Sequence, residues 1–335
     1  MKFSENLYTL RKNKQISQEK LSELVDVSRQ SVSKWELGES YPTLENIFKL
    51  CNVLNCKMNE LINEKLADFD LLSDEIKNTQ KFYERFLGYA DTYDEGRPKL
   101  PGKAIEILKT YLDGCIKTIV DIGCGTGLST EVCASFADNV IGVEPSIDML
   151  NKARTKENEK MRFIQGYGEK TGLDDECADI VICSQAFHWM EPEATLKEVY
   201  RILRKGGILA VIDADYPPVI NKDLEILHNH LRKKTAIIEK WENKWATDKS
   251  EHLTNIRNSG LFEYSREICF EHTEEYDLER FKKFMLSQSS MQRAIKNNYD
   301  KIADELNVLD EKLYNVFRGQ ALNAMFSYRI RIGIK

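Results

Sequence analysis

Five short runs rich in valine and isoleucine recur between residues 118 and 215, and this pattern constrains the fold more than any other feature of the chain. The runs occupy residues 118–123, 140–145, 161–166, 178–185 and 207–215. Helix-like segments separate the first run from the second, the second from the third, and the fourth from the fifth. Strands that alternate with helices build a parallel sheet covered on both faces. We therefore predict an α/β domain with a doubly wound, mostly parallel, Rossmann-like sheet.

The sequence on either side of this core predicts further elements. Residues 1–65 have the pattern of several short helices, and residues 66–81 form a polar stretch that is expected to be a helical linker. The sheet domain is expected over residues 82–335, with its core at about 100–215. The remaining predicted elements are lid helices at about 219–260 and 276–322, and antiparallel edge strands at 267–272 and 326–335. The whole chain is thus expected to be α + α/β.

Charge, hydropathy and cysteine content exclude several classes of protein. The 335 residues include 48 Lys and Arg against 54 Asp and Glu, so no uniformly basic surface is expected. No apolar run approaches the ~18 residues of a membrane span, and the N-terminus lacks the apolar core of a signal peptide. The eight cysteines form no CxxC pair and no zinc-like spacing with histidine. We expect a cytoplasmic protein with reduced thiols, no metal and no membrane contact.

Two short helices near the N-terminus are expected to be joined by a tight turn. Ser17 and Ser28 are each placed to cap the start of a helix, and only residues 25–27 lie between the two helices. Such a pair is a helix-turn-helix. On the second helix Val32 and Trp35 are expected to point inward. The side chains left outward, of the kind that reaches base edges and phosphates in a major groove, are Arg29, Gln30, Ser31, Ser33 and Lys34.

About 55 residues of this region closely resemble the helix-turn-helix domain of Cro and the phage repressors, the XRE family. The most specific part is the stretch 27–36 followed by Gly38 and Pro42. The resemblance implies that residues 1–65 bind DNA, and it implies a homodimer because such repressors match two half-sites. The implied DNA contacts are Gln18, Arg29, Gln30, Ser31, Ser33 and Lys34. A helical domain that serves only protein contacts is the alternative.

Residues 1–65 carry almost no net charge. Their cations are expected to gather in one patch formed by Arg11, Lys12, Lys14, Arg29 and Lys34. DNA binding should therefore depend on that local patch and on a second half-site rather than on bulk attraction.

A glycine-rich loop follows the first predicted strand of the sheet. Gly123, Gly125 and Gly127 allow the backbone to pass close to a ligand. Leu128 occupies the position of the third glycine in a dinucleotide fingerprint, and no GK[ST] follows, so dinucleotide and Walker-type sites fit poorly. Glu144 closes the next strand roughly 20 residues later, where a carboxylate can accept both ribose hydroxyls of a nucleoside.

Two further polar segments follow predicted strands. Residues 166–169 come after the third strand, where the edge of an adenine would lie, and residues 184–189 come after the fourth. Every one of these motifs therefore lies at the carboxyl end of a strand, where open α/β sheets bind their ligands.

The order DxGCGTG, VEPS, a GxxE turn and FHW resembles class I S-adenosylmethionine-dependent methyltransferases, especially the small-molecule group with the trans-aconitate and ubiquinone/menaquinone-pathway enzymes. Residues 93–98 (YDEGRP) resemble that group's upstream YxxxRP segment. The resemblance implies S-adenosyl-L-methionine as cofactor and S-adenosyl-L-homocysteine as product. The implied cofactor contacts are Tyr93, Arg97, Asp121, Gly123, Cys124, Gly125, Gly127, Glu144, Pro145, Ser146, Gly168, Glu169, Ser184 and Gln185. Tyr167 departs from the pattern because the GxxE turn usually has a small residue there.

Methyl transfer from a sulfonium is an in-line displacement, so the protein mainly aligns the reactants and excludes water. His188 is the candidate general base, with a role in the pocket wall as the alternative; a carboxylate acceptor needs no base. Arg97 is expected to pair with the methionine carboxylate or with an acidic substrate. Trp241, four residues before Trp245, belongs either to the core or to an aromatic lid. The residues predicted to line the substrate pocket are His188, Trp189, Trp241 and Ser287.

Two functions fit these motifs. The first is a methyltransferase acting on a small-molecule acceptor, with transfer to oxygen favoured, tethered to a DNA-binding regulator domain. The alternative is a transcriptional regulator whose methyltransferase-like domain only senses the cofactor, its product or another metabolite. DNA methylation is disfavoured because the fourth strand is not followed by the [DNS]PP[YF] segment that holds a flipped base.

Overall fold

The computed structural model describes residues 3–38, 40, 42, 44–54, 56, 61, 90–239 and 248–335. The chain divides into two compact units, residues 1–81 and 82–335. The linker predicted at residues 66–81 lies outside the described residues. No helix among the described residues is both long enough and apolar enough to cross a bilayer.

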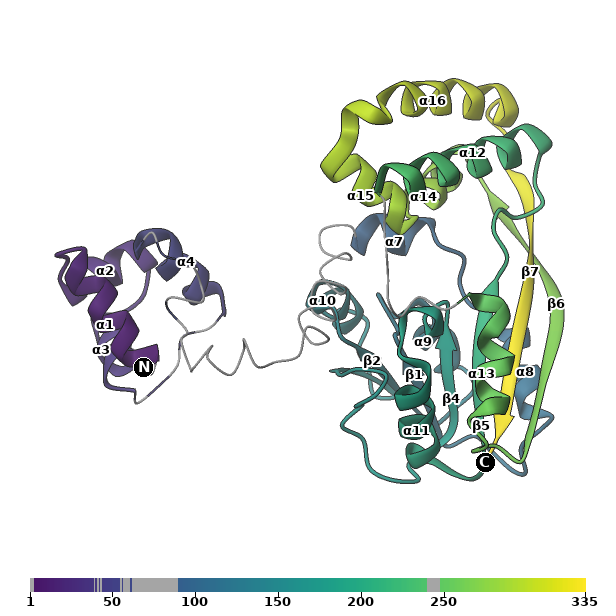
Figure 1. The fold of residues 1–335 in the computed structure, drawn as a ribbon, viewed down its shortest axis with the longest axis horizontal. Coiled ribbons are helices and arrows are strands. Elements are labelled where there is room, and N and C mark those ends of the chain that lie inside the picture. Colours follow the sequence, from purple (N-terminus) through teal and green to yellow (C-terminus); the bar gives the residue numbers. More distant parts are fainter. Residues whose placement is uncertain are drawn as a thin grey trace. The chain divides into compact units, whose positions relative to one another are not determined.

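The first unit is a bundle of short helices around a small apolar core (Figure 1). Its helices are α1 (Phe3–Asn13), α2 (Gln18–Val25), α3 (Arg29–Leu37) and α4 (Leu44–Leu54). The buried apolar side chains are Phe3, Leu7, Leu21, Val25, Val32, Trp35, Ile47, Leu50, Leu54 and Leu61. Val32 and Trp35 point inward as predicted, and they fix which face of α3 remains outside.

Serine hydroxyls cap both helices of the predicted helix-turn-helix. The Ser17 Oγ accepts the backbone N–H of Lys20 at 3.0 Å, and the Ser28 Oγ accepts that of Ser31 at 3.1 Å. Asp26 ends α2 in the left-handed region at φ 60°, and the chain turns there into α3. Each cap satisfies a backbone donor that the first helical turn leaves unpaired.

The second unit contains a seven-stranded sheet of order β3-β2-β1-β4-β5-β7-β6 (Figure 1). The first five strands are parallel to one another, and β7 and β6 are antiparallel additions. The strands are β1 (Thr118–Ile122), β2 (Asn139–Glu144), β3 (Met161–Gln165), β4 (Ala178–Ser184), β5 (Leu203–Ala214), β6 (Tyr264–Tyr276) and β7 (Leu322–Ile334). The predicted mostly parallel sheet is confirmed.

The prediction of two antiparallel edge strands is wrong for the later one. β6 lies at the edge of the sheet, but β7 lies inside it, paired with β5 on one side and β6 on the other. Alternate residues of β7, from Ala324 to Ile332, are buried in the main apolar core, and Arg331, on the opposite face, is only 3% exposed. A strand with both faces covered and both edges paired belongs to the interior of a sheet.

Helices cover both faces of the sheet because neighbouring strand residues point to opposite sides. In β4, Ile180 and Ile182 pack with α8 (Gly102–Lys109), whereas Val181 and Cys183 pack on the side of α11 (Pro192–Ile202) and α13 (His252–Asn258). The helices α9 (Leu128–Cys133) and α10 (Ile147–Arg154) follow β1 and β2. All three predicted strand–helix–strand alternations are thus present.

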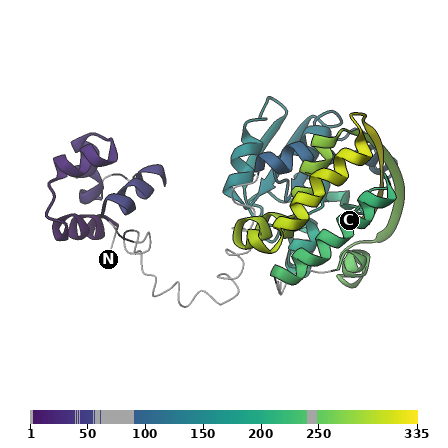
Figure 2. The same cartoon turned by 90° about the horizontal axis from the view of Figure 1, so that it is seen from above.

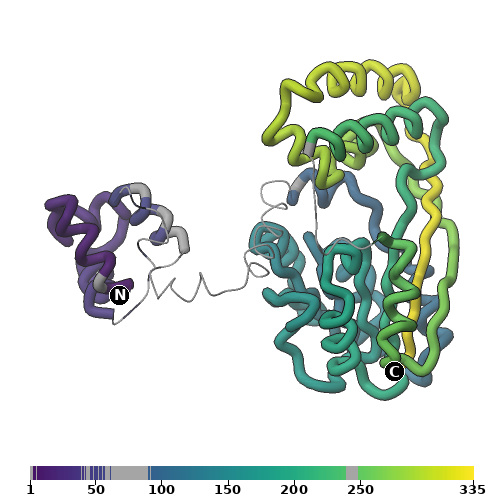
Figure 3. Tube along the Cα trace, in the orientation of Figure 1, coloured from purple at the N-terminus to yellow at the C-terminus, as the bar shows by residue number. Residues whose placement is uncertain are grey.

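Late helices gather over one end of the sheet domain (Figures 1 and 3). They are α12 (Lys222–Glu239), α14 (Leu278–Leu286), α15 (Ser289–Asn298) and α16 (Ala303–Phe317). Figure 2 shows α12 and α16 running side by side across this end. The short helix α7 (Ala90–Gly96) packs against α14, so a segment from the start of the domain meets one from near its end.

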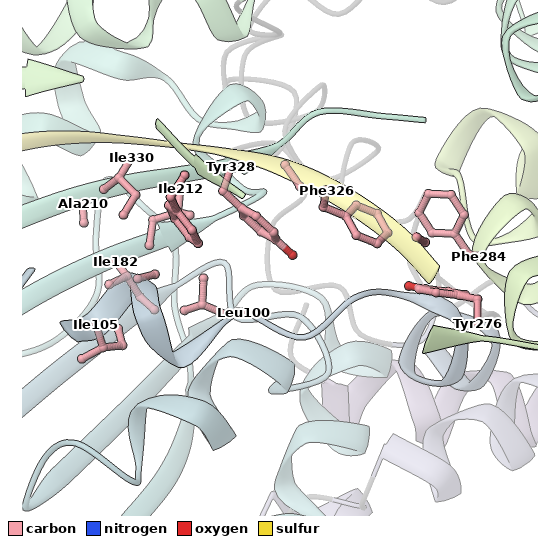
Figure 4. Close-up of a cluster of buried hydrophobic side chains, with 14 of the residues drawn as sticks. Leu100, Ile105, Ile182, Ala210, Ile212, Tyr276, Phe284, Phe326, Tyr328 and Ile330 are labelled. Atoms are coloured by element: carbon pink, nitrogen blue, oxygen red, sulfur yellow. The ribbon is translucent and has the colours of Figure 1, made fainter. Parts of the chain in front are cut away.

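An aromatic cluster attaches these helices to the antiparallel strands (Figure 4). The ring of Phe284 in α14 lies 5.9 Å from that of Phe326 in β7 and 6.0 Å from that of Tyr276 in β6. It also lies 5.2 Å, edge-to-face, from the ring of Tyr216. Because aromatic rings bury large areas in fixed geometry, this cluster holds the late helices in place.

Candidate functional site

The loop between β1 and α9 depends on glycine at two positions where a side chain would clash. Gly123 has φ 72°, and a Cβ there would lie 2.6 Å from the Cβ of Ala186. Gly127 has φ 87°, and its Cβ would lie 2.8 Å from the ring of Phe163. Gly125, by contrast, has open space before it, because a Cβ there would come no closer than 3.9 Å to the ring of Tyr93. Gly123 and Gly127 therefore let the loop pack, and Gly125 leaves room for a ligand.

Glu144, at the end of β2, faces this loop and is only 6% exposed. Its Oε2 accepts the N–H of Gly125 at 2.9 Å, and its Oε1 accepts the N–H of Ser146 at 2.8 Å. Burial raises the pKa of the Glu144 carboxyl to about 7, against the opposing effect of those two hydrogen bonds. Each oxygen retains a lone pair for a further donor, as a nucleoside ribose would supply.

Asp121 is fully buried behind the loop. Its Oδ2 accepts hydrogen bonds from the hydroxyls of Ser129 at 2.6 Å and Thr130 at 2.7 Å. Burial raises the pKa of the Asp121 carboxyl to about 6. The carboxylate therefore ties the end of β1 to the first turn of α9.

A pocket opens at the carboxyl ends of these strands. Its walls are Tyr93, Gly123, Gly125, Glu144, Pro145, Met149, Gly168, Gln185, Ala186, Trp189 and Met190. A mainly apolar wall with one carboxylate suits an adenosine group. The buried hydroxyl of Ser146 next to Glu144 has no hydrogen-bond partner among the described residues.

Several of the predicted cofactor contacts do not line this pocket. Those that do are Tyr93, Gly123, Gly125, Glu144, Pro145, Gly168 and Gln185. Those that lie outside its walls are Arg97, Asp121, Cys124, Gly127, Ser146, Glu169 and Ser184. Cys124 is buried, and that burial raises the pKa of its thiol well above the usual range.

A second pocket adjoins the first. Its walls are Tyr93, Arg97, Gln185, His188, Trp189, Tyr216, Arg232, Ala236, Lys249, Ser287, Gln288, Ser289, Ser290 and Arg293. Three residues, Tyr93, Gln185 and Trp189, line both pockets. The structure thus brings together His188, Trp189 and Ser287 of the predicted substrate pocket, whereas Trp241 lies outside the described residues.

Arg97 enters the second pocket between two aromatic rings. Its guanidinium carbon lies 4.9 Å from the ring centre of Tyr93 and 5.3 Å from that of Tyr216. Its Nη2 donates a hydrogen bond to the carbonyl of Ser287 at 3.1 Å. Since Ser287 directly follows α14, this contact links the start of the domain to the late helices.

A buried carboxylate, Asp213 at the end of β5, organises the wall behind the second pocket. Its Oδ1 lies 2.9 Å from the Lys249 Nζ, and its Oδ2 lies 2.8 Å from the Arg331 Nη1 and 3.1 Å from the His252 Nδ1. Although burial acts to raise it, the His252 hydrogen bond and the Lys249 charge hold the pKa of Asp213 well below its usual range. Asp213 is therefore an anion that positions Lys249.

Gln185 lies between the two pockets, and His188 lines the second. The Gln185 side chain accepts a hydrogen bond from the Lys249 Nζ at 2.5 Å, and its backbone holds a left-handed φ of 54°. The His188 Nδ1 is 3.8 Å from Asp213, too far for a hydrogen bond. Burial, and then the nearby Lys249 charge, hold the pKa of His188 well below its usual range. At neutral pH this imidazole is therefore uncharged.

The sequence motifs did not predict most of the residues that form the wall around Asp213. Asp213 had one visible signal, a carboxylate inside an otherwise apolar run. Lys249, His252 and Arg331 had none, because they come from segments far apart in the sequence that only the fold brings together.

The helix-turn-helix exposes part of its predicted DNA-contacting set. Arg29, Gln30 and Lys34 are exposed on α3, while Ser31 and Ser33 are half-buried. The hydroxyls of Ser28 and Ser31 are 2.9 Å apart, so they interact with each other. The exposed face of α3 is thus donor-rich.

Arg11 does not belong to the exposed cationic patch, and that prediction is wrong. It is 5% exposed and forms a two-pronged ion pair with Glu36, at 2.5 Å and 2.9 Å. It also donates to the carbonyl of Ile16 at 2.9 Å. Gln18, a predicted DNA contact, donates to the same Glu36 carboxylate at 2.7 Å. The guanidinium fixes α1 against α3, because a buried charge needs a partner.

Across the parts of the chain that the structure describes, no group of three or more His, Cys, Asp or Glu side chains is placed to hold a metal ion.

Two segments of the chain match known families. Residues 120–211 match the family described as a methyltransferase domain, and residues 7–61 match the helix-turn-helix family. The first match runs from within β1 to within β5 and includes the loop and Glu144. The second runs from within α1 past the end of α4.

Curated relatives and solved structures agree with these matches. The sheet domain is 37% identical over 124 residues to a probable S-adenosylmethionine-dependent methyltransferase of Saccharomyces cerevisiae, covering 35% of this chain and 43% of that protein. It is 31% identical over 155 residues to the ubiquinone/menaquinone biosynthesis C-methyltransferase of Campylobacter jejuni, covering 41% and 65%. The chain spans about half the length of the first curated relatives it matches. A candidate type II methyltransferase from Anaeromyxobacter dehalogenans has the same fold, with a TM-score of 0.55, 19% identity, and coverage of 71% and 97%.

Proposed function

The chain joins an XRE-type helix-turn-helix domain to a class I methyltransferase domain, and from this premise we propose that it methylates a small molecule while its first domain binds DNA. We propose S-adenosyl-L-methionine as the methyl donor, an oxygen of the acceptor as the methylated atom, and DNA binding as a homodimer. The cytoplasm is the expected location.

The first pocket supports the proposed cofactor. Glu144 is the proposed acceptor for the ribose hydroxyls, and the open space at Gly125 accommodates the methionine portion. Pro145, Met149 and Gly168 supply a wall for the adenine. Bound S-adenosyl-L-methionine supplies an activated methyl group on a positively charged sulfur. Asp121, Cys124 and the other predicted contacts outside the walls are proposed to hold the loop from behind.

The observation that carries the proposal of turnover is the wall shared by the two pockets. Tyr93, Gln185 and Trp189 line both, so a molecule in the second pocket lies next to one in the first. A protein that only sensed the cofactor would need the first pocket alone. Holding two reactants in one enclosed space is the main contribution an enzyme makes to such a displacement.

His188 is proposed to be a wall residue rather than a base. Its lowered pKa makes the imidazole a weak base, and its Nδ1 is buried without a hydrogen-bond partner among the described residues. A carboxylate oxygen needs no proton removed before it is methylated, and this agrees with transfer to oxygen.

The test begins with calorimetric titration of the full chain with S-adenosyl-L-homocysteine. The wild type should bind it, and Glu144→Ala should bind at least about tenfold more weakly, since hydrogen bonds to a charged group are lost. Glu159→Ala, which removes an exposed carboxylate beyond α10, is the matched control and should be unchanged. Absence of binding to the wild type would overturn the proposal.

Turnover is tested with methyl-labelled S-adenosyl-L-methionine and a small-metabolite extract. Label should appear in a small molecule, and the product mass should identify it. Binding without any transfer of label would favour the sensor instead.

DNA binding is tested by selecting bound sequences from a random pool. The wild type should enrich a site with two half-sites, and Arg29→Ala with Lys34→Ala should lose most of the affinity without a change in secondary structure. A pool that shows no enrichment would contradict this part of the proposal.

A further inference from the structure

The second pocket is lined by positive charge. Arg97, Arg232, Lys249 and Arg293 all contribute to its walls, and the described residues lining it include no Asp or Glu. The first pocket differs, because its lining holds one carboxylate, Glu144, and no Lys or Arg. The two adjoining pockets therefore suit ligands of different charge.

The four cations come from four separate elements. Arg97 directly follows α7, Arg232 lies on α12, Lys249 precedes α13, and Arg293 lies on α15. These four side chains therefore reach the same pocket from different parts of the fold. Such an arrangement favours a ligand with more than one anionic group.

Neutral hydrogen-bond donors in the second pocket also favour an anionic ligand. Ser289 and Ser290 form the first turn of α15, whose backbone N–H groups and helix dipole favour an anion. The side chain of Gln288, just before this helix, makes no capping hydrogen bond to it. The Gln288 Nε2 is buried with no acceptor among the described residues, so it can donate a hydrogen bond to an oxygen of a bound anion.

Lys249 contacts the wall that the two pockets share. Its Nζ contacts both Gln185 and Asp213, and the Asp213 carboxylate is also bound by Arg331 and His252. Asp213 therefore holds the Lys249 ammonium in place in the wall of the pocket.

We propose that the methyl acceptor is a small polyanion, carrying at least two carboxylate or phosphate groups, held by Arg97, Arg232, Lys249 and Arg293. This inference rests on the proposed methyltransferase function, and it names the class of its substrate.

The test uses the full chain saturated with S-adenosyl-L-homocysteine and two anionic probes, citrate and pyrophosphate, with neutral triethyl citrate as comparator. Calorimetry should show binding of at least one anion and none of the ester. Binding of citrate but not of pyrophosphate would indicate that the acceptor carries carboxylate groups. Binding of pyrophosphate but not of citrate would indicate phosphate groups.

Paired variants locate the binding. Arg232→Gln with Arg293→Gln should weaken anion binding about tenfold or more, since two charged donors are lost. Lys233→Gln with Lys296→Gln, which removes exposed cations from the same two helices, should leave it unchanged. Both variants should bind S-adenosyl-L-homocysteine like the wild type.

The outcomes separate the two proposals. If S-adenosyl-L-homocysteine binds but neither anion does, or if the Arg232/Arg293 variant binds the anion as well as the wild type, the inference is overturned. If the anion bound to the helix-turn-helix instead, the Arg232/Arg293 variant would bind it as well as the wild type does, because the substituted residues belong to the sheet domain. Failure of S-adenosyl-L-homocysteine to bind at all would instead overturn the proposed function.

Discussion

The carboxylate of Glu144 accepts the backbone N–H of Gly125 at 2.9 Å, joining the end of β2 to the loop that follows β1. Gly125 lies in the loop after β1, and Glu144, 19 positions later in the chain, ends the neighbouring parallel strand β2. The contact fixes the carboxylate at the opening of the first pocket. A ligand that hydrogen-bonds to it therefore meets a group already in place.

Cofactor affinity should rise with pH through the ionisation of Glu144. Burial raises the pKa of this carboxyl to about 7, so the ionised form, the better acceptor for ribose hydroxyls, gains population between about pH 6 and pH 8. Calorimetry with S-adenosyl-L-homocysteine across that range should show increasing affinity that levels off above pH 8. Glu144→Gln should bind about tenfold more weakly, with no such rise. A rise that persists in this variant would show that another group titrates.

Methyl transfer should not depend on ionisation of His188. Burial and the nearby Lys249 charge hold the pKa of its imidazole well below the usual range, so it is already uncharged at neutral pH. We expect His188→Gln to keep the rate of label transfer within about tenfold of the wild type, whereas removing a general base costs ~10²–10⁴-fold. A loss in that larger range, with cofactor affinity intact, would make His188 a base.

Substituting Asp213 should destabilise the sheet domain strongly. Asp213→Ala leaves Arg331 and Lys249 without their shared buried carboxylate, which should cost about 3–5 kcal/mol of unfolding free energy. Hydrogen exchange of peptides from β5 and β7 in the full chain measures this. Asp215→Ala breaks an exposed pair with Arg329 and should cost under about 1 kcal/mol.

The ion cluster around Asp213 also determines how the stability of the sheet domain depends on pH. The folded pKa of Asp213 lies below its unfolded value, so its contribution is fully present above the ordinary aspartate pKa and is lost only as pH falls below it. We therefore expect the hydrogen-exchange protection of β5 peptides to stay constant between pH 5 and pH 8. A change in protection caused by Asp213 over that range would contradict its lowered pKa.

Arg11 should matter for the stability of the helix-turn-helix rather than for contact with DNA. Arg11→Ala leaves the Glu36 carboxylate buried beside Gln18 without its ion partner, at a cost of about 3–5 kcal/mol. Hydrogen exchange of the α2 and α3 peptides should accelerate accordingly. Lys20→Ala, which breaks an exposed pair with Glu23, is the control and should change exchange little. Normal protection of α3 in Arg11→Ala would refute this role.

The sequence predicted the features that depend on local pattern. Runs of valine and isoleucine located β1 to β5, and serines before helical segments located two caps. The position of Glu144 at the end of β2 followed from the strand it closes. These features need only residues that are close together in the chain or in neighbouring parallel strands.

What the sequence did not predict depends on long-range pairing. The place of β7 inside the sheet, the burial of Arg11 and the grouping of Lys249 with Asp213 all require segments far apart in the chain. The positive lining of the second pocket is the clearest case, because its four cations come from separate elements and share no motif. Only the folded arrangement shows that they face one space.

The position of β7 also sets an order for assembly on the ribosome. The helix-turn-helix core is complete once residue 61 has emerged, long before the sheet can close. Until residues 322–334 are synthesised, β5 has an open edge, β6 has no partner strand, and Asp213 lacks Arg331. A nascent chain can therefore present a finished helix-turn-helix while its second pocket is still unbuilt, and a product truncated before β7 would expose a bare strand edge prone to aggregation.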